Sequence, residues 1–293
     1  MKSDSYRLWR IDPLLKCRAY PRVICTAMQD AGGNISYIEN MLHVEITPLS
    51  RPLDSIGEMD AWFQDNIKCH FPDKNGYVQR VAAAFVQAKA DSISVQALSY
   101  TDRDIYSFSN VDIFFAVMDG MHSAFAPETR LLADLFVYNV ADKDRLDEIL
   151  SAHWFNGVDI CNYANSMSMG DMKAISRKAH KHNMIVKAHV GEFGGADDVM
   201  RYAEELELDQ IQHGIAAARS PQIMNWLAEH KVQLNVCPTS NLLLGNTESY
   251  ETHQIRILYD YGIPVGVQCH SFSRIPELVQ CKTHDCQRIE PNP

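Results

Sequence analysis

From about residue 74 onward, short apolar runs alternate along the chain with segments of helical pattern. The apolar runs are four to ten residues of nearly continuous hydrophobicity, which is typical of strands in a parallel sheet that is covered on both faces. The runs predict strands at 93–100, 111–120, within 153–162, and at 183–190, 208–214, 232–238 and 263–269.

Helical patterns separate these runs. Segment 77–90 has a helical composition, and segment 170–182 carries Met172, Ile175 and Ala179 at helical spacing. Segment 196–206 places two aspartates in its first turn, where the helix dipole favours negative charge. Ser220 followed by Pro221 predicts an N-cap and the first residue of a further helix.

Seven strand–helix alternations favour an α/β fold, a (β/α)8 TIM-type barrel formed by one domain over residues 1–293. The competing architecture is an open doubly wound sheet, but no glycine-rich dinucleotide loop follows any predicted strand. The first seventy residues do not follow the alternation. Segments 6–15 and 40–46 are both candidates for the first strand, and the sequence does not choose between them.

Composition narrows the functional class. A net charge of -10 without a basic cluster argues against a nucleic-acid-binding protein. No apolar run approaches the length of a membrane span, and the polar start of the chain does not resemble a signal peptide. Eight cysteines in 293 residues do not form a disulfide framework, so we expect free thiols in the cytoplasm.

Polar side chains follow several predicted strands at the edge where barrel enzymes carry their chemistry. His189 and Glu192 lie in "KAHVGEFGG" (187–195), His213 ends the next strand, and Cys269–His270 end the last one. Imidazoles that meet at one rim can hold a divalent metal that acidifies water, and a nearby carboxyl group can move protons. The pattern predicts metal-assisted hydrolysis.

Three ordered segments, "AHVGE", "HG" and "NVCPTSN" (235–241), resemble the "HAGE", "HG" and "CPxSN" segments of the adenosine deaminase family. The resemblance covers residues 74–268. It implies a (β/α)8 barrel that binds one Zn²⁺ per chain and removes the 6-amino group of adenosine or a related aminopurine. It also implies that His189 is a zinc ligand, that Glu192 donates a proton to the purine ring, and that His213 lies beside the attacking hydroxide.

The resemblance further assigns substrate contacts to Gly191 and Asn162 and places His270 where the family has a metal-binding aspartate. Asn162 stands where the family has a glycine, so its side chain either contributes to the pocket or blocks it. The family's His-x-His pair is absent from the first seventy residues, and His43 with Glu45 is the nearest substitute. Residues 1–73 and 269–293 diverge, so we expect a barrel that is incomplete or degenerate at both ends.

Two other groups of candidate ligands are less consistent with a metal site. His180–Lys181–His182 has the His-x-His spacing, but it lies at the predicted C-terminal end of a helix, where cationic side chains are favoured. Cys281, His284 and Cys286 are three ligands where a zinc knuckle normally needs four.

Two alternatives to an active deaminase therefore stay open. One is a catalytically silent barrel that binds a purine or a partner, and the other is a purely structural barrel. Stoichiometric zinc that survives dialysis would exclude the silent barrel. The sequence does not fix the purine or the oligomeric state.

Overall fold

A computed structural model describes residues 17–19, isolated positions between 53 and 69, and residues 73–90, 95–139, 143–163 and 165–267. Several predicted features lie outside the described residues and stay predictions. They are the candidate first strands at 6–15 and 40–46, the candidate ligands His43, Glu45 and His270, and the cysteine- and histidine-containing tail at 281–293.

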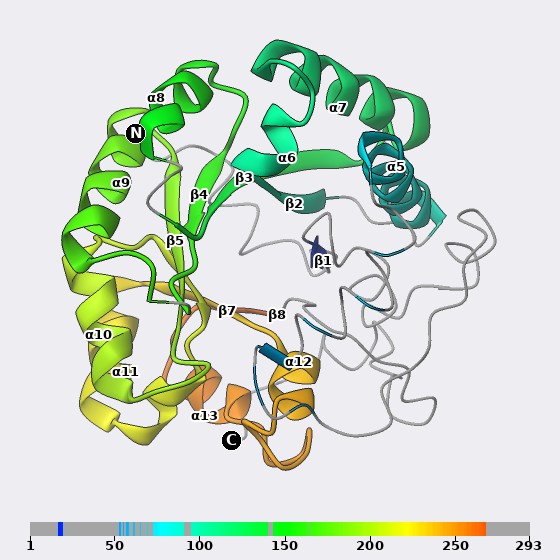
Figure 1. Cartoon of the computed structure of the whole chain (residues 1–293). Helices are drawn as coiled ribbons and strands as arrows, with labels where there is room; N and C mark the ends of the chain where they lie inside the picture. The colour runs from blue at the N-terminus through cyan, green and yellow to red at the C-terminus, as the bar shows by residue number, and fades with distance from the viewer. Residues whose placement is uncertain are drawn as a thin grey trace.

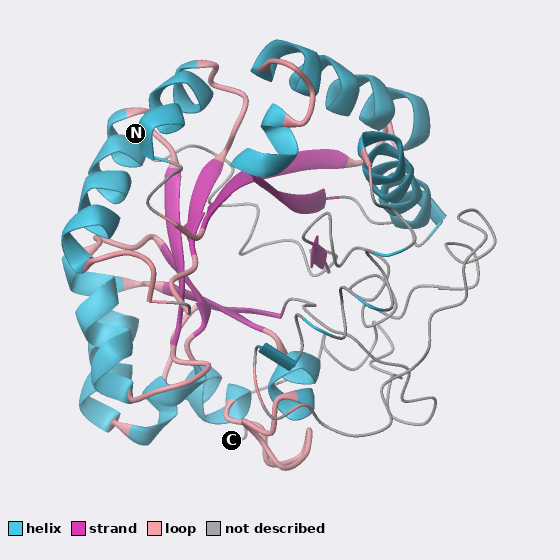
Figure 2. Ribbon diagram, in the orientation of Figure 1, coloured by secondary structure: helices cyan, strands magenta, loops and turns pink. Residues whose placement is uncertain are grey.

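Eight parallel strands form one curled sheet in chain order, with helices around its outer side (Figures 1 and 2). The strands are β1 (Cys17–Ala19), β2 (Val95–Thr101), β3 (Arg130–Val137), β4 (Gly157–Ile160), β5 (Ile185–Val190), β6 (Gln210–His213), β7 (Gln233–Val236) and β8 (Val265–Val267). Among the described residues the recorded pairing runs from β1 to β8 without a β8–β1 pair. The predicted barrel-type fold is confirmed as this curled sheet.

The helices follow the strands along the chain. They are α5 (Lys74–Ala90), α6 (Asp102–Tyr106), α7 (Val111–Phe125), α8 (Lys143–Ser151), α9 (Met169–Lys181), α10 (Ala196–Glu205), the 3-10 helix η3 (Ile215–Arg219), α11 (Pro221–His230), α12 (Pro238–Leu243) and α13 (Ile255–Asp260). In the described part of the chain, none of them is long and apolar enough to cross a membrane.

Helix ends follow the local sequence. The Ser220 side chain caps α11 by accepting a hydrogen bond from the backbone N–H of Ile223. Pro221 is the first residue of the helix, as predicted. His180–Lys181–His182 closes α9, and Nε2 of His180 lies 3.2 Å from Oδ2 of Asp209. The prediction that this triplet is a helix end is confirmed.

The prediction of a strand at 111–120 is wrong, because that segment belongs to α7. The Asn110 side chain accepts a hydrogen bond from the backbone N–H of Ile113 and so caps the helix. Val111, Phe114, Phe115 and Met118 are buried at helical spacing, which a continuous apolar run conceals. The strand that pairs with β2 is β3, which the sequence analysis did not predict because Asp134 interrupts its apolar run.

The alternation of side chains along each strand separates an apolar face from a polar one. On β5, Val186 and Ala188 are part of the hydrophobic core between sheet and helices, whereas Lys187 and His189 point to the inner face of the curled sheet. Neighbouring strands repeat the pattern in register. The buried polar residues of the inner face are Asp134, Asp159, Lys187, His189, Gln210, Gln212, Gln233 and Asn235.

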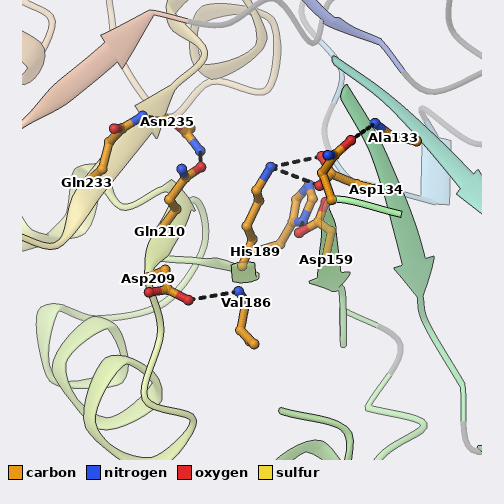
Figure 3. Close-up of polar contacts among 11 residues, drawn as sticks. Ala133, Asp134, Asp159, Val186, His189, Asp209, Gln210, Gln233 and Asn235 are labelled. Carbon is orange, nitrogen blue, oxygen red and sulfur yellow. Dashed lines mark hydrogen bonds and ion pairs between the residues drawn. The ribbon is translucent and has the colours of Figure 1, made fainter. Parts of the chain in front are cut away.

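A buried ion pair lies on this inner face. Lys187 Nζ donates to both carboxylate oxygens of Asp134, at 3.0 and 2.8 Å, and both side chains are almost fully buried. Gly157 on β4 leaves the space that the pair needs, since a Cβ there would lie 2.5 Å from Oδ1 of Asp134 and 2.9 Å from the carbonyl oxygen of Ile185. Figure 3 shows Asp134 beside Asp159 and His189.

We expect Lys187→Met to lower the free energy of unfolding by about 3–5 kcal/mol, because it leaves the Asp134 carboxylate buried without its cation. The double variant Lys187→Met with Asp134→Leu removes both charges and should recover most of the loss. Urea denaturation at pH 7 measures both. A single variant as stable as the wild-type protein would contradict the importance of the pair.

Candidate active site

A glycine turn after β5 sets the position of Glu192. Gly191 has a φ of 73°, and a Cβ there would lie 2.4 Å from Cγ2 of Val199 and 3.2 Å from Cα of Gly214. Only glycine fits this backbone at this distance. The Gly191 carbonyl accepts a hydrogen bond from the N–H of Ala216 at 2.9 Å, which ties the turn to the segment that follows β6.

The carboxyl group of Glu192 is buried and held at both oxygens. The Tyr163 hydroxyl donates to Oε2 at 2.6 Å, and the Ser240 hydroxyl donates to Oε1 at 3.3 Å. Burial raises the pKa of Glu192, and the hydrogen bond from Tyr163, the nearby His189 and the bond from Ser240 oppose that rise. A carboxyl group whose pKa is raised keeps its proton to a higher pH than a free glutamate and can act as a general acid.

His189 lies on the inner face of β5 with a carboxylate close to its ring. Nδ1 of His189 is 3.3 Å from Oδ1 of Asp159 on β4, and both side chains are buried (Figure 3). The rings of Phe136 and Tyr163 pack edge-on against the imidazole, each with its centroid 5.8 Å away. A carboxylate near one ring nitrogen is a common neighbour of metal-binding histidines.

His213 ends β6 beside Glu192 and His189. Nδ1 of His213 is 3.4 Å from Oε1 of Glu192, and the two imidazole rings of His213 and His189 are 5.5 Å apart. The three residues that the sequence analysis placed at strand ends therefore meet in one site. His213 itself has a φ of 67°, a left-handed backbone that turns the chain out of the strand into Gly214.

A chain of hydrogen bonds through His253 and Asn241 orients the ring of His213. The backbone N–H of Ile255 donates to Nδ1 of His253, so the neutral ring carries its proton on Nε2, which lies 3.3 Å from Oδ1 of Asn241. Nδ2 of Asn241 then donates to Nδ1 of His213 at 3.3 Å. In this arrangement a neutral His213 carries its own proton on Nε2.

The two predicted substrate contacts have different surroundings. Gly191 forms the turn below Glu192, as described above. The side-chain amide of Asn162 is engaged within its own loop, since Nδ2 donates to the carbonyl of Met167 and Oδ1 accepts from its N–H, both at 2.9 Å. Asn162 thus closes the loop after β4, and its contact with a purine stays a prediction.

Of the predicted metal ligands, the described residues include His189, with the carboxylate of Asp159 close to its Nδ1. They contain no group of three or more His, Cys, Asp or Glu side chains that would hold a metal ion. The described part of the site therefore does not amount to a complete zinc site. The described arrangement places the buried carboxyl group of Glu192 close to the imidazole of His213, with the imidazole of His189 next to that of His213.

Sequence reasoning missed five residues that support this site. Ser240 and Asn241 belong to the "CPTSN" segment, which was noted without a role for either side chain. For Asp159 the sequence showed only a carboxylate within a predicted buried strand. Tyr163 and His253 carried no pattern, since they reach Glu192 and Asn241 from loops far away along the chain.

Known proteins that resemble this chain include deaminases. The adenosine deaminase family model matches residues 82–271. A putative adenosine/adenine deaminase of Treponema pallidum is 31% identical over 185 residues, which are 61% of this chain and 62% of that protein. The match with this relative thus spans less than two thirds of its length.

Solved structures show the same fold at low identity. Arabidopsis ADAL complexed with GMP superposes with a TM-score of 0.67 at 12% identity, covering 91% of this chain and 83% of that one. An amidohydrolase from Burkholderia ambifaria with bound Zn gives a TM-score of 0.60 at 14% identity, covering 91% and 78%.

The buried His253 should make the free energy of unfolding depend on pH. Burial lowers its pKa from 6.5 to about 4. Between these values the unfolded chain binds a proton at this position and the folded chain does not, so the free energy of unfolding should fall as the pH drops through that window. His253→Gln should flatten this slope in urea denaturation between pH 7 and 4, and an unchanged slope would contradict the assignment.

Proposed function

Because the chain belongs to the adenosine deaminase family, we propose that it is a hydrolase that removes the 6-amino group of adenosine or a related aminopurine. The observation that carries the proposal is the buried carboxyl group of Glu192, with its raised pKa, next to His213. The reaction replaces the C6 amine with oxygen from water and releases ammonia. The purine is a free base, a nucleoside or a nucleotide.

Glu192 is the proton donor in this proposal. Its raised pKa favours the protonated carboxyl group, which gives its proton to a purine ring nitrogen and makes C6 more electrophilic. Tyr163 and Ser240 fix the two oxygens, so the carboxyl group does not have to be ordered when substrate binds. His213, which carries its proton on Nε2 in this arrangement, would donate a hydrogen bond and so stabilise the charge that develops on the attacking oxygen.

We further propose one Zn²⁺ per chain, with His189 and His270 among its ligands. A bound zinc ion supplies an acidified water at neutral pH. The support is family membership and the carboxylate of Asp159 3.3 Å from Nδ1 of His189, a neighbour that metal-binding histidines commonly have.

A catalytically silent barrel that binds a purine is the second candidate. One observation favours it, since His189 is the one predicted metal ligand within the described residues. A single imidazole does not hold zinc tightly enough to activate water. Metal content and ammonia release separate the two candidates.

We expect the wild-type protein, supplied with zinc, to release ammonia from at least one member of a panel of adenine, adenosine and adenosine monophosphate. Glu192→Gln should reduce kcat by about 10²-fold or more, because the proton donor is lost. Glu229→Gln, an exposed carboxylate on α11, is the matched control and should retain full activity. No ammonia from any substrate would contradict the proposed hydrolysis.

Zinc analysis after dialysis tests the metal proposal. The wild-type protein should retain about one zinc per chain, and His189→Ala should lose most of it. His180→Ala changes a histidine at the end of α9 and should leave the zinc content unchanged. A wild-type protein that holds no zinc would favour the silent barrel.

A further inference from the structure

Gln212 lies beside His189 on the inner face of the sheet. The two residues are register partners on β5 and β6, and Asn235 on β7 is the next partner along the same row. Paired residues of parallel strands face the same side, so the Gln212 side chain points inward with His189. Gln212 also directly precedes His213 at the end of β6.

The carboxamide of Gln212 has no hydrogen-bond partner among the described residues. The residue is fully buried, and both Nε2 and Oε1 are without a partner. The neighbouring amides bond to one another, since Gln233 donates to Asn235 at 2.8 Å and Asn235 donates to Gln210 at 2.8 Å. Figure 3 shows Gln210, Gln233 and Asn235 together on the inner face.

An unpaired buried amide destabilises a protein and is rare in folded structures, so its presence requires an explanation. A glutamine with an unused donor and an unused acceptor complements a group that presents the same pair. An aminopurine presents such a pair. Its exocyclic amino group donates, and a ring nitrogen that accepts a hydrogen bond lies on each side of it. Glutamine recognises adenine in nucleic acids through such a pair of bonds.

We propose that Gln212 is a specificity-determining residue that binds the reacting amino group of the purine. This inference rests on the proposed function. Oε1 of Gln212 accepts an N–H of the amine, while Nε2 donates to the ring nitrogen that Glu192 does not engage. Gln212 neighbours His189 across the sheet and His213 along β6, so in this proposal the reacting carbon lies near both imidazoles and its amine contacts the Gln212 amide.

Equilibrium binding isolates this contact from turnover. In a Glu192→Gln background, which blocks catalysis, calorimetry compares adenosine with purine ribonucleoside, which lacks the amine, and adenine with purine. Adding Gln212→Met should weaken the binding of the amino compounds about tenfold. It should change the binding of the compounds without an amine by less than about twofold, because they make no bond to the amide.

Thermal unfolding of the same variants gives a second readout that needs no ligand. Gln212→Met should have a Tm equal to or above that of its parent, because it removes an amide without a partner. Gln233→Met is the matched control. It removes an amide that bonds Asn235, so it should lower Tm and leave the preference for amino compounds unchanged.

The outcomes separate this proposal from the proposed hydrolysis. Equal weakening of both ligand types, or a lower Tm with an unchanged preference, would overturn the role of Gln212. A preference lost in Gln212→Met while the wild-type protein releases no ammonia would support the amine contact and reject the hydrolysis. If neither purine type binds the Glu192→Gln protein, the role of Gln212 is rejected, whereas the hydrolysis is judged by ammonia release from the wild-type protein.

Discussion

The strict alternation of side chains along parallel strands is the constraint on which the rest of the structure depends. Each strand sends one set of residues to the helices and the other to the inside of the curled sheet. On β5 and β6 this divides Ala188 and Ile211 from His189 and Gln212. A shift of one residue in register would bury the imidazole among helices and turn an apolar side chain toward the site.

The candidate site uses four consecutive strands and the loops that follow them. β4 supplies Asp159, β5 supplies His189 and the turn to Glu192, β6 supplies His213, and the segment after β7 supplies Ser240 and Asn241. Because these strands are neighbours in register, residues that are far apart along the chain meet within hydrogen-bonding distance. The sheet therefore places His189 and His213, while the turns and segments after the strands place Glu192, Ser240 and Asn241.

Local sequence predicted the parts of the fold that local physics determines. The strand ends at His189 and His213 and the cap at Ser220 follow from patterns within a few residues. Segment 111–120 was misassigned because its mainly apolar run hides the helical period, whereas the Asn110 cap and packing on α5 favour a helix. Tyr163 and His253 were unpredictable, since their roles depend on partners that the folded chain brings from elsewhere.

Gly157, Asp134 and Lys187 also constrain how this barrel can change over evolutionary time. A larger side chain at position 157 collides with the carboxylate of Asp134. Loss of that carboxylate leaves the ammonium group of Lys187 buried without its counterion. The three positions are therefore epistatic, and single substitutions at any of them pass through a less stable protein. Relatives that lack one member of the trio should have replaced the others as well, so these positions should covary across the family.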